Sequence, residues 1–207
     1  FTWDRLATQR PLHIAVLGVA VGLFLVIPLV FLANVNLMLF PERWTEVRGF
    51  LGALTLTNVF PRYLHFLCAS LIVTSLFGVW YFGRPGFRAE QAFDRLTKPA
   101  LRRIFYSLAL AVSLAQFVVG PLVLFTLPSR GLDVSVVAMI LLGAGVSLPA
   151  VWMMWRELSV REPHGKRLPF IAAYLLLTVL CMATGRHMYR EVALAEHRAE
   201  MQEATSR

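Results

Sequence analysis

Long apolar stretches bounded by charged residues dominate the sequence. Five windows of 18 to 31 residues contain no Asp, Glu, Lys or Arg. A helix needs about 20 apolar residues to cross about 30 Å of hydrocarbon, whereas membrane strands are shorter and alternate in polarity. The pattern therefore predicts an all-α integral membrane bundle of five transmembrane helices, at about residues 12–39, 61–83, 101–127, 134–156 and 168–189.

Composition supports a membrane environment and excludes an ordinary water-soluble domain. Hydrophobic residues make up 57% of the 207 residues, charged residues 15%, and the mean hydropathy is +0.64. Soluble proteins average about 45–50% apolar and about 25% charged residues. Cys68 and Cys181 both lie in apolar runs, so neither a disulfide framework nor a zinc cluster is available. The sequence contains no Cys-x-x-Cys-His, which excludes a covalently attached c-type haem.

The distribution of charge predicts an orientation. Segments 1–10, 84–103 and 156–167 fall on one side of the predicted bundle and carry a net charge of +7, against +1 on the other side. The positive-inside rule places the first side in the cytoplasm of a bacterial inner membrane, with the N-terminus inside and the C-terminal tail outside. This asymmetry explains the pI near 10.3 without nucleic acid. We expect the 84–103 loop to meet anionic lipid headgroups or to hold the topology.

The last residues differ in character from the predicted bundle of residues 1–189. Val192, Ala195 and Ala199 recur at helical spacing among charged residues. Residues 190–207 are therefore predicted to form an amphipathic or solvated helical tail on the outer side, which either stays in solvent or binds a partner.

Ionisable side chains inside predicted spans are candidates for function. His65 lies just inside the outer end of the second span, with Arg62 one turn earlier on the same face. A neutral imidazole can ligate haem iron, and the guanidinium could meet a haem propionate. The alternative is an interfacial histidine hydrogen-bonded to a neighbouring helix.

A methionine and a second histidine are further candidates near the outer ends of the spans. Met139 of the fourth span carries a thioether, the common partner of histidine on a low-spin haem. Gly143 and Gly145 would let a flat macrocycle or another helix approach. His187, beside Arg186, is expected at the end of the fifth span, where it either ligates a second haem or caps the helix. His13, on the inner side, is interpreted as structural.

At these residues the chain resembles subunit I of the cytochrome bd family of quinol oxidases. The similarity covers five helices in the same order. It implies that His65 and Met139 are the axial ligands of a low-spin haem b. The segments that carry it are Phe1-x-Trp3-Asp4-Arg5-Leu6, Phe31-Leu32-Ala33-Asn34, Thr57-Asn58-Val59-Phe60-Pro61-Arg62-Tyr63-Leu64-His65, Ala69-Ser70, Val79-Trp80-Tyr81, Ala138-Met139-Ile140-Leu141-Leu142-Gly143 and Gly185-Arg186-His187.

Three departures from that family limit what the resemblance implies. The family's three helices before the Trp-Asp-Arg-Leu segment have no counterpart in this sequence, and its long quinol-binding loop is reduced to residues 128–133. The glutamate ligand of its high-spin haem falls at Ala183. One turn further, His187 would supply an imidazole instead, with Arg186 near a propionate. The chain alone is therefore not expected to reduce oxygen.

These features predict a haem b subunit that passes electrons within a larger respiratory or photosynthetic-type complex. Its expected partners are other membrane subunits and the lipid bilayer, with a c-type cytochrome on the outer side or quinol as candidate redox partners. The alternatives are a haem-free membrane anchor, and part of a bd-type oxidase whose missing helices lie upstream or in another chain. The sequence contains no Walker A, Gly-x-Gly-x-x-Gly, Gly-x-Ser-x-Gly or His-Glu-x-x-His motif. None of the five predicted spans contains a carboxylate, which argues against a proton-coupled transporter.

The charge asymmetry generates a test of orientation. An epitope tag inserted in the 84–103 loop should be shielded from protease in intact cells and cut in inverted membrane vesicles, because this loop belongs to the +7 side. A tag after residue 207 should show the opposite pattern. Cleavage of the loop tag in intact cells would overturn the predicted orientation.

Overall fold

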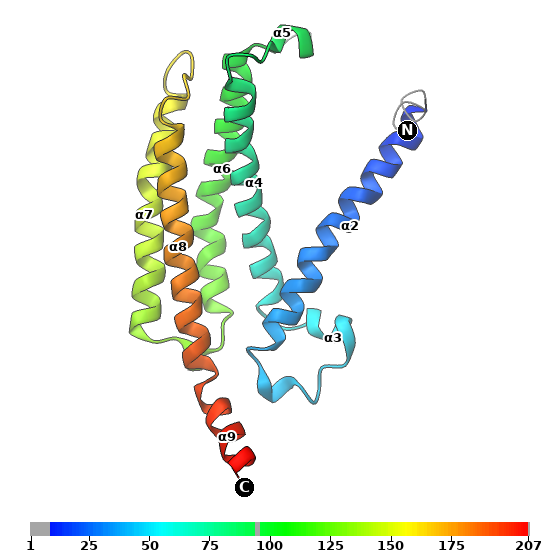
Figure 1. Cartoon of the computed structure of the whole chain (residues 1–207), viewed down its shortest axis with the longest axis vertical. Helices are drawn as coiled ribbons and strands as arrows, with labels where there is room; N and C mark the ends of the chain where they lie inside the picture. Colours follow the sequence, from blue (N-terminus) through cyan, green and yellow to red (C-terminus); the bar gives the residue numbers. More distant parts are fainter. Residues whose placement is uncertain (1–8, 94–95, 207) are drawn as a thin grey trace. The chain divides into compact units, whose positions relative to one another are not determined.

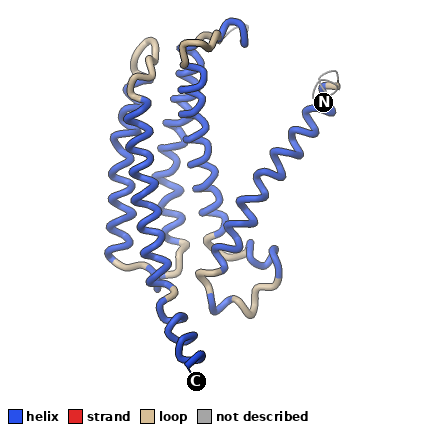
Figure 2. The backbone as a smooth tube through the Cα atoms, viewed as in Figure 1, coloured by secondary structure: helices blue, strands red, loops and turns tan. Residues whose placement is uncertain are grey.

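The computed structural model describes residues 9–93 and 96–206, and this part of the chain contains helices and no strands. The all-α prediction is therefore confirmed (Figures 1 and 2). The Phe1 to Leu6 part of the resemblance and the basic residue Arg95 lie outside the described residues. Five helices are long and apolar enough to cross a membrane, as a multi-pass membrane protein requires: α2 (Arg10–Leu37), α4 (Val59–Gly83), α6 (Lys98–Phe125), α7 (Val134–Leu158) and α8 (Leu168–Ala193).

Two of these helices, α7 and α8, extend beyond their predicted C-terminal ends. Helix α7 continues to Leu158 instead of residue 156, and α8 continues to Ala193 instead of residue 189. The predicted windows stopped near charged residues, yet a helix can extend beyond the hydrocarbon with its backbone bonds intact. As a result, Glu157 and Glu191 lie inside helices that the sequence predicted to be free of carboxylates.

The chain divides into two compact units, and the division falls within α4, between Tyr63 and Leu64. In the first unit, α2 packs with the short helix α3 (Gly49–Leu54) around buried Ala33, Ala53, Leu56 and Val59. The hydroxyl of Tyr63 donates a hydrogen bond to the carbonyl of Leu25 (2.9 Å), which fastens the start of α4 to α2. The 3-10 turn η1 (Pro41–Arg43) lies between α2 and α3.

The second unit is an antiparallel bundle of α4, α6, α7 and α8, in which α7 and α8 run side by side (Figure 1). Its buried core contains side chains from all four helices. They lie in the half of the bundle nearer the 84–97 and 159–167 connections: Ile72, Leu76, Val79, Tyr106, Ala109, Ala150, Met154 and Ile171. The half of α4 that carries His65 lies beyond this cluster.

Short segments complete the second unit. Helix α5 (Ala89–Ala92) precedes α6, and the 3-10 turn η2 (Ser129–Gly131) connects α6 to α7. Asp133 caps α7, since its Oδ1 accepts from the Val134 N–H (2.7 Å) and its Oδ2 from the Ser135 hydroxyl (2.6 Å). The hydrogen bond from Ser135, followed by that from Val134, lowers the pKa of the Asp133 carboxyl.

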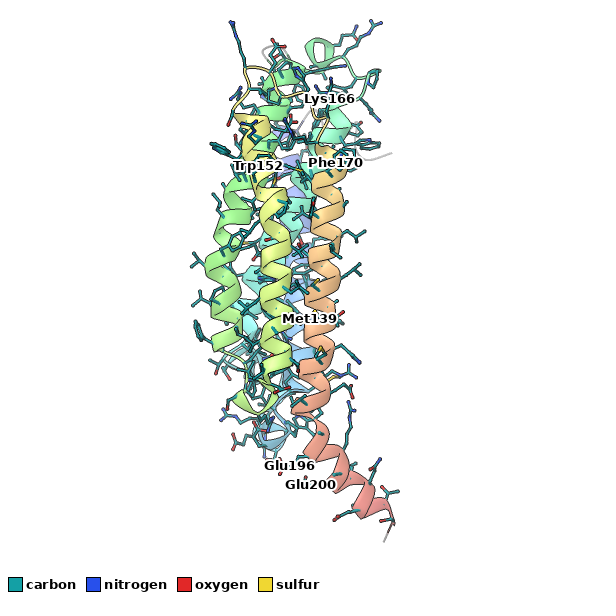
Figure 3. The ribbon with its side chains drawn as sticks, turned by 90° about the vertical axis from the view of Figure 1, so that its left-hand side faces the viewer. Met139, Trp152, Lys166, Phe170, Glu196 and Glu200 are labelled. Atoms are coloured by element: carbon teal, nitrogen blue, oxygen red, sulfur yellow. The ribbon has the colours of Figure 1, made fainter. Side chains whose placement is uncertain are left out.

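The predicted tail is helical. Helix α9 (Ala195–Ser206) follows α8, and Arg198 Nη2 donates to Glu191 Oε1 (3.0 Å), which ties the two helices together. This bond raises the pKa of Arg198. Glu196 and Glu200 extend from α9 (Figure 3), and no described residue of α9 is buried, as expected for a solvated helix.

Candidate functional site

His65 lies on α4 at an interface with α6. Its side chain is half-buried and its Nδ1 atom is buried. The side-chain amide of Gln116 on α6 donates a hydrogen bond to the backbone carbonyl of His65 (3.0 Å). In an apolar membrane interior such an interhelical bond is worth about 0.6–2 kcal/mol. This bond therefore holds the α4 backbone at His65 against α6.

Polar atoms of α6 gather near this contact. Ser113 and Gln116 are three residues apart and therefore share one face of α6. Within the described residues, Ser113 Oγ and Gln116 Oε1 are buried and have no hydrogen-bond partner. Buried polar groups normally have partners, so these orphaned oxygens mark a place where a further group can bind.

Met139 lies at a different interface. Figure 3 shows it where α7 and α8 run side by side. A Cβ atom added to Gly185 of α8 would lie 3.5 Å from Met139 Cγ and 3.6 Å from Met139 Cβ. The Cβ and Cγ atoms of Met139 therefore lie against α8, and its role as an axial ligand opposite His65 stays a prediction.

The neighbours of Gly143 distinguish between its two expected roles, the approach of a macrocycle and the approach of another helix. A Cβ atom at this position would lie 3.1 Å from Met182 Cε and 3.2 Å from Cys181 Cβ, both on α8. The missing side chain therefore allows α7 and α8 to pack closely, as small residues do between membrane helices. At Gly145 an added Cβ would have no neighbour within 4 Å.

The contacts of α6 define how α4 and α7 are aligned. Gln116 reaches His65 on α4, and Arg103, 13 residues earlier on α6, donates to the carbonyl of Leu158 on α7 (3.2 Å). With a rise of about 1.5 Å per residue, the α7 position level with His65 is about residue 145, roughly 9 Å from Met139 along the axis. This offset is within one to two helical turns.

The other candidates occupy separate surroundings. Arg62 Nη1 donates to Asn36 Oδ1 (3.1 Å) in the first unit, where Asn36 and Asn58 are fully buried. The predicted contact of Arg62 with a haem propionate would therefore have to coexist with this hydrogen bond to Asn36. His13 is half-buried on α2.

Arg186 and His187 are exposed on α8. Because α8 extends to Ala193, His187 lies inside the helix rather than at its end, and the expectation that it caps the helix is wrong. Ala183, one turn earlier, is also exposed, so this face of α8 is turned away from the described packing.

Sequence reasoning missed a buried carboxylate at the opposite end of the bundle. Glu157 of α7 is 1% exposed, and its Oε2 accepts from the backbone N–H groups of His164 and Gly165 (3.1 Å each). Its Oε1 accepts from Arg167 Nη1 (3.1 Å). The only signal in the sequence was a glutamate just beyond the charged boundary of a span, before a loop with glycine at position 165. Gly165 adopts a positive φ of 74° there, a conformation that favours glycine.

Within the described residues, no group of three or more His, Cys, Asp or Glu side chains is arranged to hold a metal ion. Haem iron needs only one or two protein ligands, so this observation concerns metal clusters and not haem. No protein-family model, curated protein or solved structure matches the chain.

The Glu157 contacts generate a stability prediction. Glu157→Ala should destabilise the second unit by about 3 kcal/mol, because it leaves two loop N–H groups without their acceptor at a buried position and removes the partner of Arg167. Glu162→Ala, in the exposed part of the same loop, should change stability by no more than about 0.5 kcal/mol. Chemical unfolding in detergent measures both values. Equal effects would contradict the structural role of Glu157.

Proposed function

We propose that this protein is a b-type cytochrome subunit, embedded in the membrane, that passes electrons within a larger respiratory or photosynthetic-type complex. The observation that carries the proposal is the half-buried imidazole of His65 in a membrane-spanning helix that contacts α6, where Ser113 and Gln116 have orphaned buried oxygens. The resemblance to cytochrome bd subunit I supports the same residue as a haem ligand. A low-spin haem b would supply reversible one-electron transfer.

The residues around His65 fit this role. A neutral imidazole is a good ligand in an apolar region, where a charged side chain would be costly. Gln116 holds the α4 backbone at this residue. The hydroxyl of Ser113 can donate or accept a hydrogen bond with a polar group beside His65, and the amide oxygen of Gln116 can accept one. Arg62, one turn along the helix, provides positive charge for a propionate.

Met139 as the second axial ligand rests on the resemblance. Its stem lies against Gly185, and an offset of roughly 9 Å from His65 has to be closed by helix tilt or by a shift of α7. The packing of Met139 against Gly185 favours a second candidate function, a haem-free anchor that has the helical bundle and binds partner subunits. A related alternative is that a helix from another chain supplies the second ligand, as in part of a bd-type oxidase.

The proposal also covers the membrane, the redox partners and a second haem. We place the chain in a bacterial inner membrane with the N-terminus inside. The haem would then lie toward the outer face, where quinol or a c-type cytochrome could exchange electrons with it. His187 and Arg186 are proposed ligands of a second haem that would sit against the exposed face of α8, with its other axial ligand from a partner subunit.

Loss of haem on removal of the imidazole is the main prediction. His65→Ala should lose the b-type band in a reduced-minus-oxidised spectrum and the corresponding pyridine haemochrome, because it removes the proposed ligand. The matched control is His197→Ala in α9, which should keep both signals. If the wild-type complex contains haem and His65→Ala keeps the full signal, the proposal fails. A wild-type complex without haem b establishes the anchor function instead.

The same haem count, applied to His187→Ala, decides the second site. A loss of one haem per complex supports His187 as a ligand. An unchanged count and spectrum show that His187 binds no haem.

A separate prediction concerns the second axial position. Met139→Leu keeps the side-chain volume and removes the thioether, so it should raise the fraction of high-spin haem or lower the midpoint potential. Met201→Leu, exposed on α9, is the control and should leave spectrum and potential unchanged. If Met139→Leu also changes nothing while His65→Ala loses haem, the second ligand comes from elsewhere.

A further inference from the structure

An open cleft of 220 Å³ lies at the end of the second unit where α4 finishes and α7 turns back into α8. Its polar lining comes from the cationic side chains of Arg84 and Arg102 and from His164. Its apolar lining includes Trp80 of α4 and Leu168 of α8. All of these residues belong to one compact unit, and none is a proposed haem ligand.

Arg102 gives the cleft a fixed positive charge. Its Nη2 donates to the carbonyl of Gly83 (2.8 Å) and its Nη1 to the carbonyl of Pro163 (3.3 Å). A Cβ on Gly83 would lie only 2.8 Å from Arg102 Nε, so the guanidinium is lodged against the end of α4. Among the described residues Nε is buried without a hydrogen-bond partner, and both carbonyl partners are neutral. These two carbonyls therefore do not neutralise the positive charge of Arg102, and an anion in the cleft would do so.

The surroundings reinforce this charge. The guanidinium of Arg84 lies 3.8 Å from the centre of the Tyr81 ring, and Lys98 Nζ donates to the carbonyl of Arg84 (3.0 Å). A second cleft of 350 Å³ shares His164 with the first. Its charged lining residues are Glu157, Lys166 and Arg167, and Phe170 lines it as well (Lys166 and Phe170 are labelled in Figure 3). The buried carboxylate of Glu157 is already bound to Arg167 and two N–H groups. The end of the bundle therefore has a positive potential.

An apolar path leads from the cleft along α4. Val73, Phe77 and Trp80 are 67%, 56% and 55% exposed, and their spacing of four and three residues places them on one face of the helix. Trp80 lies where this face meets the cleft, and tryptophan is common at the boundary between hydrocarbon and headgroups. A molecule with an anionic head and an apolar chain matches both surfaces at once.

We propose that this cleft binds the phosphate of an anionic lipid headgroup, such as that of phosphatidylglycerol, with an acyl chain along Val73, Phe77 and Trp80. The phosphodiester accepts charge-assisted hydrogen bonds from Arg84 and Arg102, which bind phosphate oxygens with fixed geometry. The apolar path distinguishes a lipid from free phosphate, because free phosphate has no apolar chain to contact it. The site is independent of the proposed haem, because it lies at the opposite end of α4 from His65.

Lipid binding to the purified full chain in neutral detergent tests the proposal by native mass spectrometry, with phosphatidylglycerol and phosphatidylcholine as probes. The wild type should bind phosphatidylglycerol more tightly. Arg84→Gln should weaken that binding about fivefold, the loss that corresponds to about 1 kcal/mol for one basic residue near anionic lipid. The control is Arg156→Gln, which removes an equal charge at the same end, where Arg156 lies 5.6 Å from the Trp152 ring and outside the cleft lining. The control should lose less than about twofold.

Three results would overturn the proposal. An equal loss in Arg84→Gln and Arg156→Gln indicates general surface attraction instead of a site. Equal binding of the two lipids excludes recognition of an anionic headgroup. Displacement of phosphatidylglycerol by inorganic phosphate at constant ionic strength assigns the cleft to free phosphate. Melting temperatures of both variants, measured in the same detergent, show that each is folded when binding is compared.

Discussion

The need to satisfy every backbone hydrogen bond without water determines this structure. Inside a bilayer an unpaired N–H or C=O costs several kcal/mol, and helices satisfy these groups within one segment. The five long helices follow from this requirement, and so does the rarity of polar side chains along them. Two of the polar side chains that do occur bind backbone of another helix: Gln116 reaches the carbonyl of His65, and Arg102 reaches the carbonyl of Gly83. These contacts join helices at places where apolar packing alone would not determine their alignment.

Two glycines allow α7 and α8 to pack closely. Gly143 and Gly185 each bring a backbone within contact distance of side chains on the opposite helix. Van der Waals contact is the main attraction between helices in lipid, since lipid tails are as apolar as the side chains. Close packing therefore explains why Met139 contacts α8, and it makes that methionine an important part of the interface whether or not it ligates iron.

The sequence predicted the class of fold and the number of long helices, because an uncharged window of about 20 residues has few structural alternatives. It did not predict that α7 would include Glu157. Hydropathy treats a charged residue as a boundary, but the bonds to the His164 and Gly165 N–H groups make burial of this carboxylate acceptable. The pairing of His65 with Met139 comes from the resemblance, supported by their similar depth, and it stays a prediction. Depth does not determine which face of a helix a residue occupies, and helix rotation depends on contacts such as Gly185 with Met139 that no single helix encodes.

The bonds of Glu157 also bear on how the chain enters the membrane. They close the turn between α7 and α8 on itself, with the carboxylate, the loop N–H groups and Arg167 satisfied by one another. The Glu157 bonds involve only α7, α8 and the turn between them, and α7 and α8 pack along their length. The last two long helices can therefore enter the bilayer together as a helical hairpin. This hairpin would then join α4 and α6, which precede it in the chain.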